Sequence, residues 1–97
     1  MAPIKNLNIA ILCGTYREYV YFCKEQNYPI DGNVKIVRGE RIKTVYCDTI
    51  ERMCGWRPDV FIRTGTWQKQ PQEIIERFDF FKKDTESRRY NDYNTAG

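Results

Sequence analysis

The chain has 97 residues, of which 41% are hydrophobic and 14% aromatic, enough for one small core and too few for two packed domains. Sixteen Lys and Arg residues against 13 Asp and Glu residues give a formal charge of +3, which permits an anionic partner without requiring one. The sequence contains no histidine, which excludes Ser-His-Asp catalysis, Cys-His catalysis and histidine-ligated zinc. No stretch is as long and apolar as a membrane span, and the first residues do not resemble a signal peptide, so we expect a cytoplasmic protein.

The first predicted elements are a buried strand and a helix. Residues 8–13 form a continuous apolar run that ends at Gly14, which is typical of a strand covered on both faces. Thr15 and Glu18 then form a capping-box pattern, and apolar residues follow at helical spacing. The pattern predicts a helix over 16–26.

The middle of the chain is less regular. Residues 30–33 indicate a turn, and residues 34–37 predict a second strand that ends in Arg38-Gly39. Residues 42–47 contain β-branched side chains and indicate a further short strand, and a second capping-box pattern favours a short helix over 48–54.

The last part of the chain predicts a strand over 59–64 and a helix over 71–83, the latter with one apolar stripe. Residues 84–97 hold no aliphatic side chain larger than alanine, and we expect a flexible polar tail there. The alternation of strands and helices predicts a single α/β domain over 1–83. We expect a small Rossmann-like, three-layer domain with a mostly parallel sheet of three or four strands and helices on its faces.

The four cysteines are interpreted as small buried hydrophobic residues. They contain no C-x-x-C pair, so the spacing predicts no zinc site, and we expect no disulfide framework. Cys13, next to Gly14 at a helix start, is the best candidate nucleophile, but it has no histidine base. Walker A, H-E-x-x-H and G-x-G-x-x-G motifs are absent from the sequence, and we expect neither a metal nor a cofactor.

The ends of the predicted strands suggest a binding edge. In an open parallel sheet, ligands bind beyond the carboxyl ends of the strands, and free N–H groups at a helix start attract anions. Three of these ends combine glycine with a nearby cation. The sequence therefore predicts an anion- or nucleic-acid-binding edge made by Gly14, Thr15, Arg17, Arg38, Gly39, Arg63, Gly65, Thr66 and Lys69, with Tyr16 and Trp67 stacking on a base.

These residues also have ordinary structural roles, and the sequence leaves both interpretations open. Gly14-Thr15-Tyr16 recurs as Gly65-Thr66-Trp67 after another predicted strand. We interpret the repetition as reuse of one strand-to-helix turn, in which glycine permits the turn and threonine caps the following helix. Exposed arginines are usually solvated.

The lack of a catalytic motif favours a binding module over an enzyme. The leading interpretation is a non-enzymatic accessory or regulatory protein that binds a partner protein or nucleic acid through the strand-end edge. One alternative is a small nucleotide- or phosphate-binding enzyme that uses the same edge. The other is a structural homo-oligomer that buries the surplus aromatic side chains of the first helix, Tyr16, Tyr19, Tyr21 and Phe22.

The order of features over residues 8–83 resembles the second RecA-like lobe of helicases. The matching segments are 9–17, 35–39 and 59–66, but the lobe's arginine-finger motif has no counterpart, so no ATPase residue is carried over. Its size, plan and lack of catalytic motifs also resemble the short Rossmann-like proteins that bacteriophages encode. That resemblance implies an accessory protein in the host cytoplasm.

Overall fold

The computed structural model describes residues 5–49 and 58–95, with side chains described as far as residue 87. The predicted helix over 48–54 falls almost entirely outside these residues. The order of the other elements agrees with the sequence prediction. The elements are β1 (Lys5–Leu12), α1 (Tyr16–Gln26), β2 (Lys35–Val37), β3 (Glu40–Tyr46), β4 (Val60–Arg63), a 3-10 turn η1 (Trp67–Lys69) and α3 (Gln72–Thr95).

The four strands form one mixed sheet in the order β2-β3-β1-β4. β1 runs parallel to both β3 and β4, whereas β2 is antiparallel to β3. The expectation of a mostly parallel sheet is therefore wrong. The reason is the segment Arg38-Gly39, which does not end a parallel strand. Arg38 has φ 52° and Gly39 has φ 80°, and two successive positive φ angles form the tight turn of a β-hairpin.

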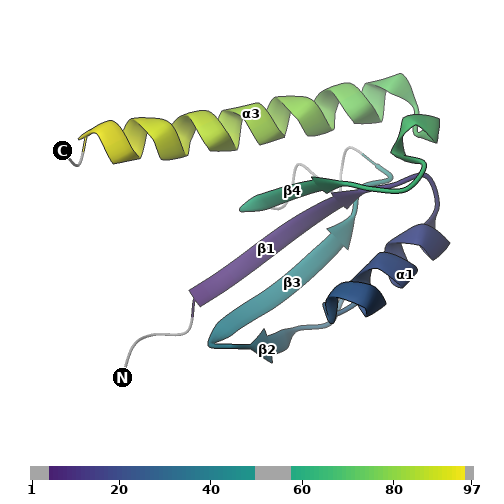
Figure 1. Ribbon diagram of the computed structural model, residues 1–97. Coiled ribbons are helices and arrows are strands. Elements are labelled where there is room, and N and C mark those ends of the chain that lie inside the picture. Colours follow the sequence, from purple (N-terminus) through teal and green to yellow (C-terminus); the bar gives the residue numbers. More distant parts are fainter. Residues whose placement is uncertain (1–4, 50–57, 96–97) are drawn as a thin grey trace.

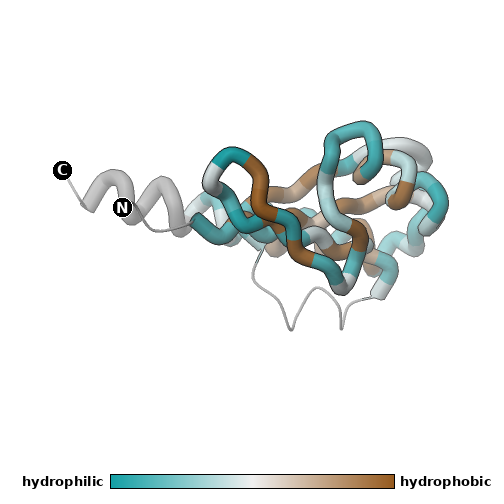
Figure 2. The backbone as a smooth tube through the Cα atoms, turned by 90° about the horizontal axis from the view of Figure 1, so that it is seen from below, coloured by the Kyte–Doolittle hydropathy of each residue, from teal (hydrophilic) through white to brown (hydrophobic). Residues whose placement is uncertain are grey.

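Two helices cover opposite faces of the sheet, so the molecule has three layers (Figure 1). The α1 face buries Ile9 and Ile11 of β1 against Tyr19 and Cys23 of the helix. The α3 face buries Ala10 and Leu12 of β1 against Ile74 and Phe78. The central strand thus sends alternate side chains into two small cores, which explains its continuous apolar run. Figure 2 shows the hydrophobic segments in the middle of the molecule and hydrophilic turns outside them.

A buried hydrogen-bond chain fixes α1 against the sheet. The Thr44 hydroxyl of β3 donates to the carbonyl oxygen of Pro29 at 2.7 Å, and Tyr19 Oη lies 2.6 Å from Thr44 Oγ1. Since the Thr44 proton is used on Pro29, the Tyr19 hydroxyl donates to Thr44. The Tyr19 and Thr44 hydroxyls and the Pro29 carbonyl oxygen thus all have a hydrogen-bond partner, so none of these three groups is buried unpaired between α1 and the sheet.

Helix α3 is longer than predicted. The expected end at residue 83 is wrong, because the helix continues to Thr95. The polar composition of residues 84–95 suggested an irregular tail, but this segment contains neither glycine nor proline to interrupt a helix. Among the described residues, no helix is both long and apolar enough to cross a bilayer.

Candidate functional site

The carboxyl ends of β1 and β4 lie side by side, as the sequence predicted. The amide of Thr64, just after β4, donates to the carbonyl oxygen of Leu12 at 3.0 Å. The two segments that follow approach so closely that a Cβ atom on Gly14 would lie 2.1 Å from Thr66 Oγ1 and 2.5 Å from the Thr66 carbonyl oxygen. Glycine is required at this position because only a hydrogen atom fits between the two backbones.

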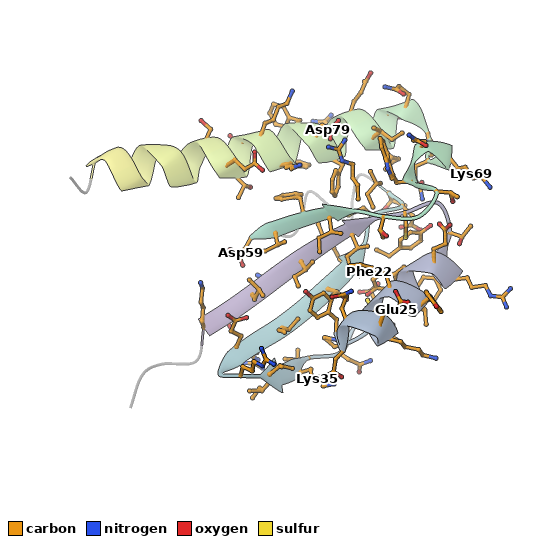
Figure 3. All side chains as sticks on the ribbon, in the orientation of Figure 1. Phe22, Glu25, Lys35, Asp59, Lys69 and Asp79 are labelled. Carbon is orange, nitrogen blue, oxygen red and sulfur yellow. The ribbon has the colours of Figure 1, made fainter. Side chains whose placement is uncertain are left out.

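Arg38 and Gly39 do not join this edge. The hairpin turn carries them to the opposite end of the sheet, where the Lys5 amide donates to the Gly39 carbonyl oxygen at 3.4 Å. Figure 3 shows the same separation, with Lys69 beyond the carboxyl ends of β1 and β4 and Lys35 near the hairpin. The predicted convergence of three glycine-bearing strand ends is thus corrected to two.

The donors of this edge are occupied by a side chain of the protein itself. The Glu18 carboxylate accepts from the backbone amides of Gly14 at 2.9 Å, Thr15 at 3.2 Å and Thr66 at 3.2 Å. It also accepts from the Thr66 hydroxyl at 2.8 Å. We call these four groups and the carboxylate the Glu18 bridge. Glu18 therefore links the start of α1 to the end of β4, residues 48 positions apart in the sequence.

The electrostatics of the Glu18 bridge are those of a bound anion. The Thr66 hydroxyl, followed by the amides of Thr66, Gly14 and Thr15, lowers the pKa of the Glu18 carboxyl below its ordinary value of 4.5. Backbone N–H groups beside a helix start stabilise negative charge, and here they stabilise an internal one. The sequence analysis expected these backbone donors to attract an anion, and in the structure they bind the Glu18 carboxylate.

The two threonines of the repeated Gly-Thr-aromatic segment have different roles. Thr15 caps α1 as predicted, because its hydroxyl accepts from the Glu18 amide at 3.2 Å and completes a capping box. Thr66 does not cap η1 through its side chain, since its hydroxyl donates to Glu18 instead. The expectation that both threonines cap a following helix is thus right for one and wrong for the other.

The predicted cations and aromatic rings of the edge are only partly available. The Arg63 guanidinium lies 5.0 Å from the centre of the Trp67 ring and 3.4 Å from an Asp79 carboxylate oxygen. Trp67 also packs on the core under α3. Arg63 and Trp67 therefore contact each other and the α3 side of the sheet, although Arg63 remains exposed, as do Arg17 and Lys69.

Cys13 does not have the environment of a nucleophile. Its side chain is fully buried, and burial together with the nearby Glu18 charge raises the pKa of the thiol to about 12. A thiol with so high a pKa remains protonated and unreactive at neutral pH. Cys23 and Cys47 are also buried, as the sequence predicted, while Cys54 lies outside the described residues.

One residue that the sequence analysis missed completes the edge. Gln70 donates from Nε2 to the Cys13 carbonyl oxygen at 2.8 Å and to Tyr46 Oη at 3.0 Å. It thereby joins the segment after η1 to the ends of β1 and β3. No spacing rule identifies such a residue, because its partners lie 57 and 24 positions away.

Two hollows lie on the outer surface of α1. A hollow of about 460 Å³ lies between α1 and the end of β4, and a second of about 450 Å³ lies along the helix. The two share Arg17 and Tyr21. The α1 surface, as we define it, consists of the residues that line the second hollow, namely Tyr16, Arg17, Val20, Tyr21 and Lys24.

Exposed aromatic side chains distinguish the α1 surface. Tyr16 is 50% exposed and Tyr21 65% exposed, whereas Tyr19 of the same helix is fully buried. The aromatic surplus predicted for this helix is therefore divided between the core and the solvent. Exposed tyrosines beside an arginine are typical of protein interfaces.

Comparisons with protein-family models, with curated protein sequences and with solved structures find no match to this chain. Within residues 5–49 and 58–95, no group of three or more His, Cys, Asp or Glu side chains is arranged to hold a metal ion.

Proposed function

We propose that this chain is a non-enzymatic binding protein, and that its partner is a protein that docks on the α1 surface. The observation that carries the proposal is the pair of adjoining hollows of about 460 and 450 Å³ that share Arg17 and Tyr21. Such a protein acts by covering a surface of its partner or by bringing the partner to another molecule, which agrees with an accessory or regulatory role.

The chemistry of the α1 surface defines the partner. Tyr16, Val20 and Tyr21 supply apolar area, and Arg17 and Lys24 are the charged residues that line the second hollow. An apolar side chain fits between the tyrosines, and a carboxylate beside it would meet one of the two cations. The expected partner segment therefore combines aromatic or aliphatic residues with an Asp or Glu that lies at the second hollow, away from Glu18 and Glu25, which line the first.

The Glu18 bridge supports this assignment over a phosphate-binding enzyme. A phosphate on the strand-end edge would compete with the Glu18 carboxylate for the amides of Gly14, Thr15 and Thr66. Like charges at so short a distance repel, so the phosphate would have to displace a side chain that is already held by four donors. The α1 surface requires no such displacement.

A peptide-display selection tests the proposal. A random peptide library is enriched against the wild-type protein, and the selected peptides are measured for binding to Tyr21→Ala and Phe80→Ala. Phe80 is the matched control, because it is another aromatic side chain, 58% exposed, on α3 rather than on α1. We expect acidic and aromatic residues in the selected peptides, a loss of binding of at least about tenfold for Tyr21→Ala, and no loss for Phe80→Ala.

Two results would contradict the proposal. One is enrichment of peptides that bind Tyr21→Ala as tightly as wild type, which would place the interface elsewhere. The other is a solution mass near twice the chain mass of 11.6 kDa that returns to the monomer value in Tyr21→Ala. That result would assign the α1 surface to a second copy of the chain, as in the homo-oligomer alternative.

A further inference from the structure

The α3-side face of the sheet is covered by α3 over only part of its length. Ala10 and Val45 lie in the core beneath the helix and are register partners on β1 and β3. Toward the starts of the same strands, the same face continues with Asn8 opposite Lys43 and Asn6 opposite Arg41. Side chains two residues apart point to one side of a strand, so these four lie on one surface.

This part of the face is open to solvent and slightly hollowed. Asn6, Arg41 and Lys43 are exposed, and a hollow of about 300 Å³ is lined by Asn6, Asn8, Val34, Arg41 and Lys43. Ile36, which pairs with Arg41 across the hairpin, is 61% exposed at the margin. We call Asn6, Asn8, Val34, Ile36, Arg41 and Lys43 the basic sheet face.

The charges on and around this surface are mostly positive. Within the described part of the chain, neither Arg41 nor Lys43 has an ion-pair partner, and Arg38 adds an exposed cation in the turn between β2 and β3. Glu40 pairs with Val37, which packs on the α1 side of the sheet. The Asp59 carboxylate lies beside Asn8 and accepts from the Asn8 backbone amide at 3.0 Å.

We propose that the basic sheet face binds the sugar-phosphate backbone of a single-stranded nucleic acid. An extended strand fits a flat sheet surface, and its regularly spaced phosphates can meet Arg41, Lys43 and Arg38 together. The carboxylates of a folded protein have no such repeat. The side-chain amides of Asn6 and Asn8 can each donate and accept hydrogen bonds. They therefore suit phosphate oxygens, sugar hydroxyls and base edges alike.

The composition of the surface also sets the character of the binding. None of its six residues is aromatic, so it offers no ring on which bases could stack, and the affinity comes mainly from phosphate contacts. Binding is therefore independent of sequence and steeply dependent on salt. This function uses the opposite side of the sheet from the α1 surface and does not rest on the protein partner proposed above.

Salt dependence gives the expected magnitude. Three phosphate contacts on a single strand predict a slope of about −2 for log K against log salt concentration. Between about 50 mM and about 200 mM salt, the affinity should fall about 20-fold. Removing Arg41 and Lys43 leaves Arg38 alone, which reduces the slope to about −0.7 and the loss to about threefold.

Fluorescence anisotropy with a labelled single-stranded oligonucleotide of about 20 nucleotides, as DNA and as RNA, provides the test. The variant Arg41→Gln/Lys43→Gln is compared with Arg17→Gln/Lys24→Gln, which removes the same charge from the α1 surface on the other side of the sheet. Circular dichroism confirms that each variant is folded. A third variant, Asn6→Ala/Asn8→Ala, should weaken binding at every salt concentration without changing the slope.

The proposal is supported if the wild type and Arg17→Gln/Lys24→Gln bind with the same steep slope while Arg41→Gln/Lys43→Gln loses most of it. It is overturned if no binding is detected at about 20 mM salt, where phosphate contacts are strongest. Equal loss of binding in both charge variants would also overturn it, because net charge rather than this face would then be responsible. Binding of poly-glutamate with the same dependence on Arg41 and Lys43 would reject the nucleic-acid assignment.

Discussion

The close approach of Gly14 to Thr66 leads to a sharp prediction for Gly14→Ala. The added Cβ atom would lie 2.1 Å from Thr66 Oγ1, 2.5 Å from the Thr66 carbonyl oxygen and 3.1 Å from the carbonyl carbon. The hydroxyl can rotate away, but the carbonyl group belongs to the backbone, so the two strand ends must separate. That movement also pulls the Thr66 donors away from Glu18.

The expected cost lies at the upper end of the range for overpacking, at about 3 kcal/mol of unfolding free energy. For a domain of this size, that corresponds to a fall in melting temperature of about 12 to 24 °C. Gly32→Ala is the matched control. Gly32 has φ +90° but no atom within 4 Å of the added Cβ, so it tests backbone strain without a clash. Its expected cost is about 1 to 2 kcal/mol.

The assay is thermal and urea unfolding of both variants, followed by circular dichroism. Adding Thr66→Ala to Gly14→Ala removes the hydroxyl but leaves the carbonyl oxygen, so rescue should be partial. The reasoning is refuted if Gly14→Ala melts within a few degrees of wild type, or if it is less destabilising than Gly32→Ala. Either result would mean that the ends of β1 and β4 are not in close contact.

Three further predictions concern the pH response, the core and the thiols. Because the folded state lowers the pKa of Glu18, its stabilising effect is present above the ordinary value of 4.5 and is lost as the pH falls through the lowered pKa. Urea unfolding from about pH 7 to about pH 3 should therefore show a smaller pH dependence for Glu18→Gln than for wild type, and equal slopes would contradict the bridge. Phe78 is fully buried, and its ring centre lies 5.4 Å from that of Phe61. Phe78→Ala should lower the free energy of unfolding by about 3 to 5 kcal/mol in the same assay. A loss below about 1 kcal/mol would show that α3 does not pack there. In a Cys54→Ser variant, Cys13 should react with a thiol reagent at about pH 8 only after unfolding, and rapid modification of Cys13 in the native protein, located by mass spectrometry, would show that the thiol is accessible.

Local patterns in the sequence predicted the elements well. The helix over 16–26 was predicted with its observed bounds, because a capping box marks its start and Asn27, in the left-handed conformation, marks its end. The succession of the described strands along the sequence was also predicted, whereas their order in the sheet was not. These features depend on residues that are a few positions apart in the sequence, so local sequence patterns are sufficient to predict them.

The direction of β2 was not predicted, although the sequence contained a usable signal. A two-residue segment that ends in glycine between two β-rich runs indicates a hairpin, and Arg38-Gly39 is such a segment. Arginine is an unusual first residue for this turn, which weakens the hairpin signal. The error displaced two of the predicted site residues, because reversing a strand moves its end to the other side of the sheet.

The Glu18 bridge could not have been predicted from spacing. Sequence patterns identified Thr15 and Glu18 as a local cap, and that interpretation is confirmed. The second role of Glu18 depends on Thr66, 48 positions away, and on the backbone approach that Gly14 permits. The basic sheet face was missed for a related reason, since Asn6 and Arg41 become neighbours only when β1 and β3 pair in this register.

β1 precedes the other described strands in the sequence, yet it lies in the interior of the sheet. β1 needs a neighbour on each side, and its partner in β4 is made about fifty residues later, as in the pairing of Ile9 with Val60. During synthesis, the edge of β1 that faces β4 therefore stays unpaired while about fifty further residues are made, although β3 can pair with the other edge sooner. Chaperone dependence and aggregation of C-terminally truncated chains are the expected costs of this arrangement.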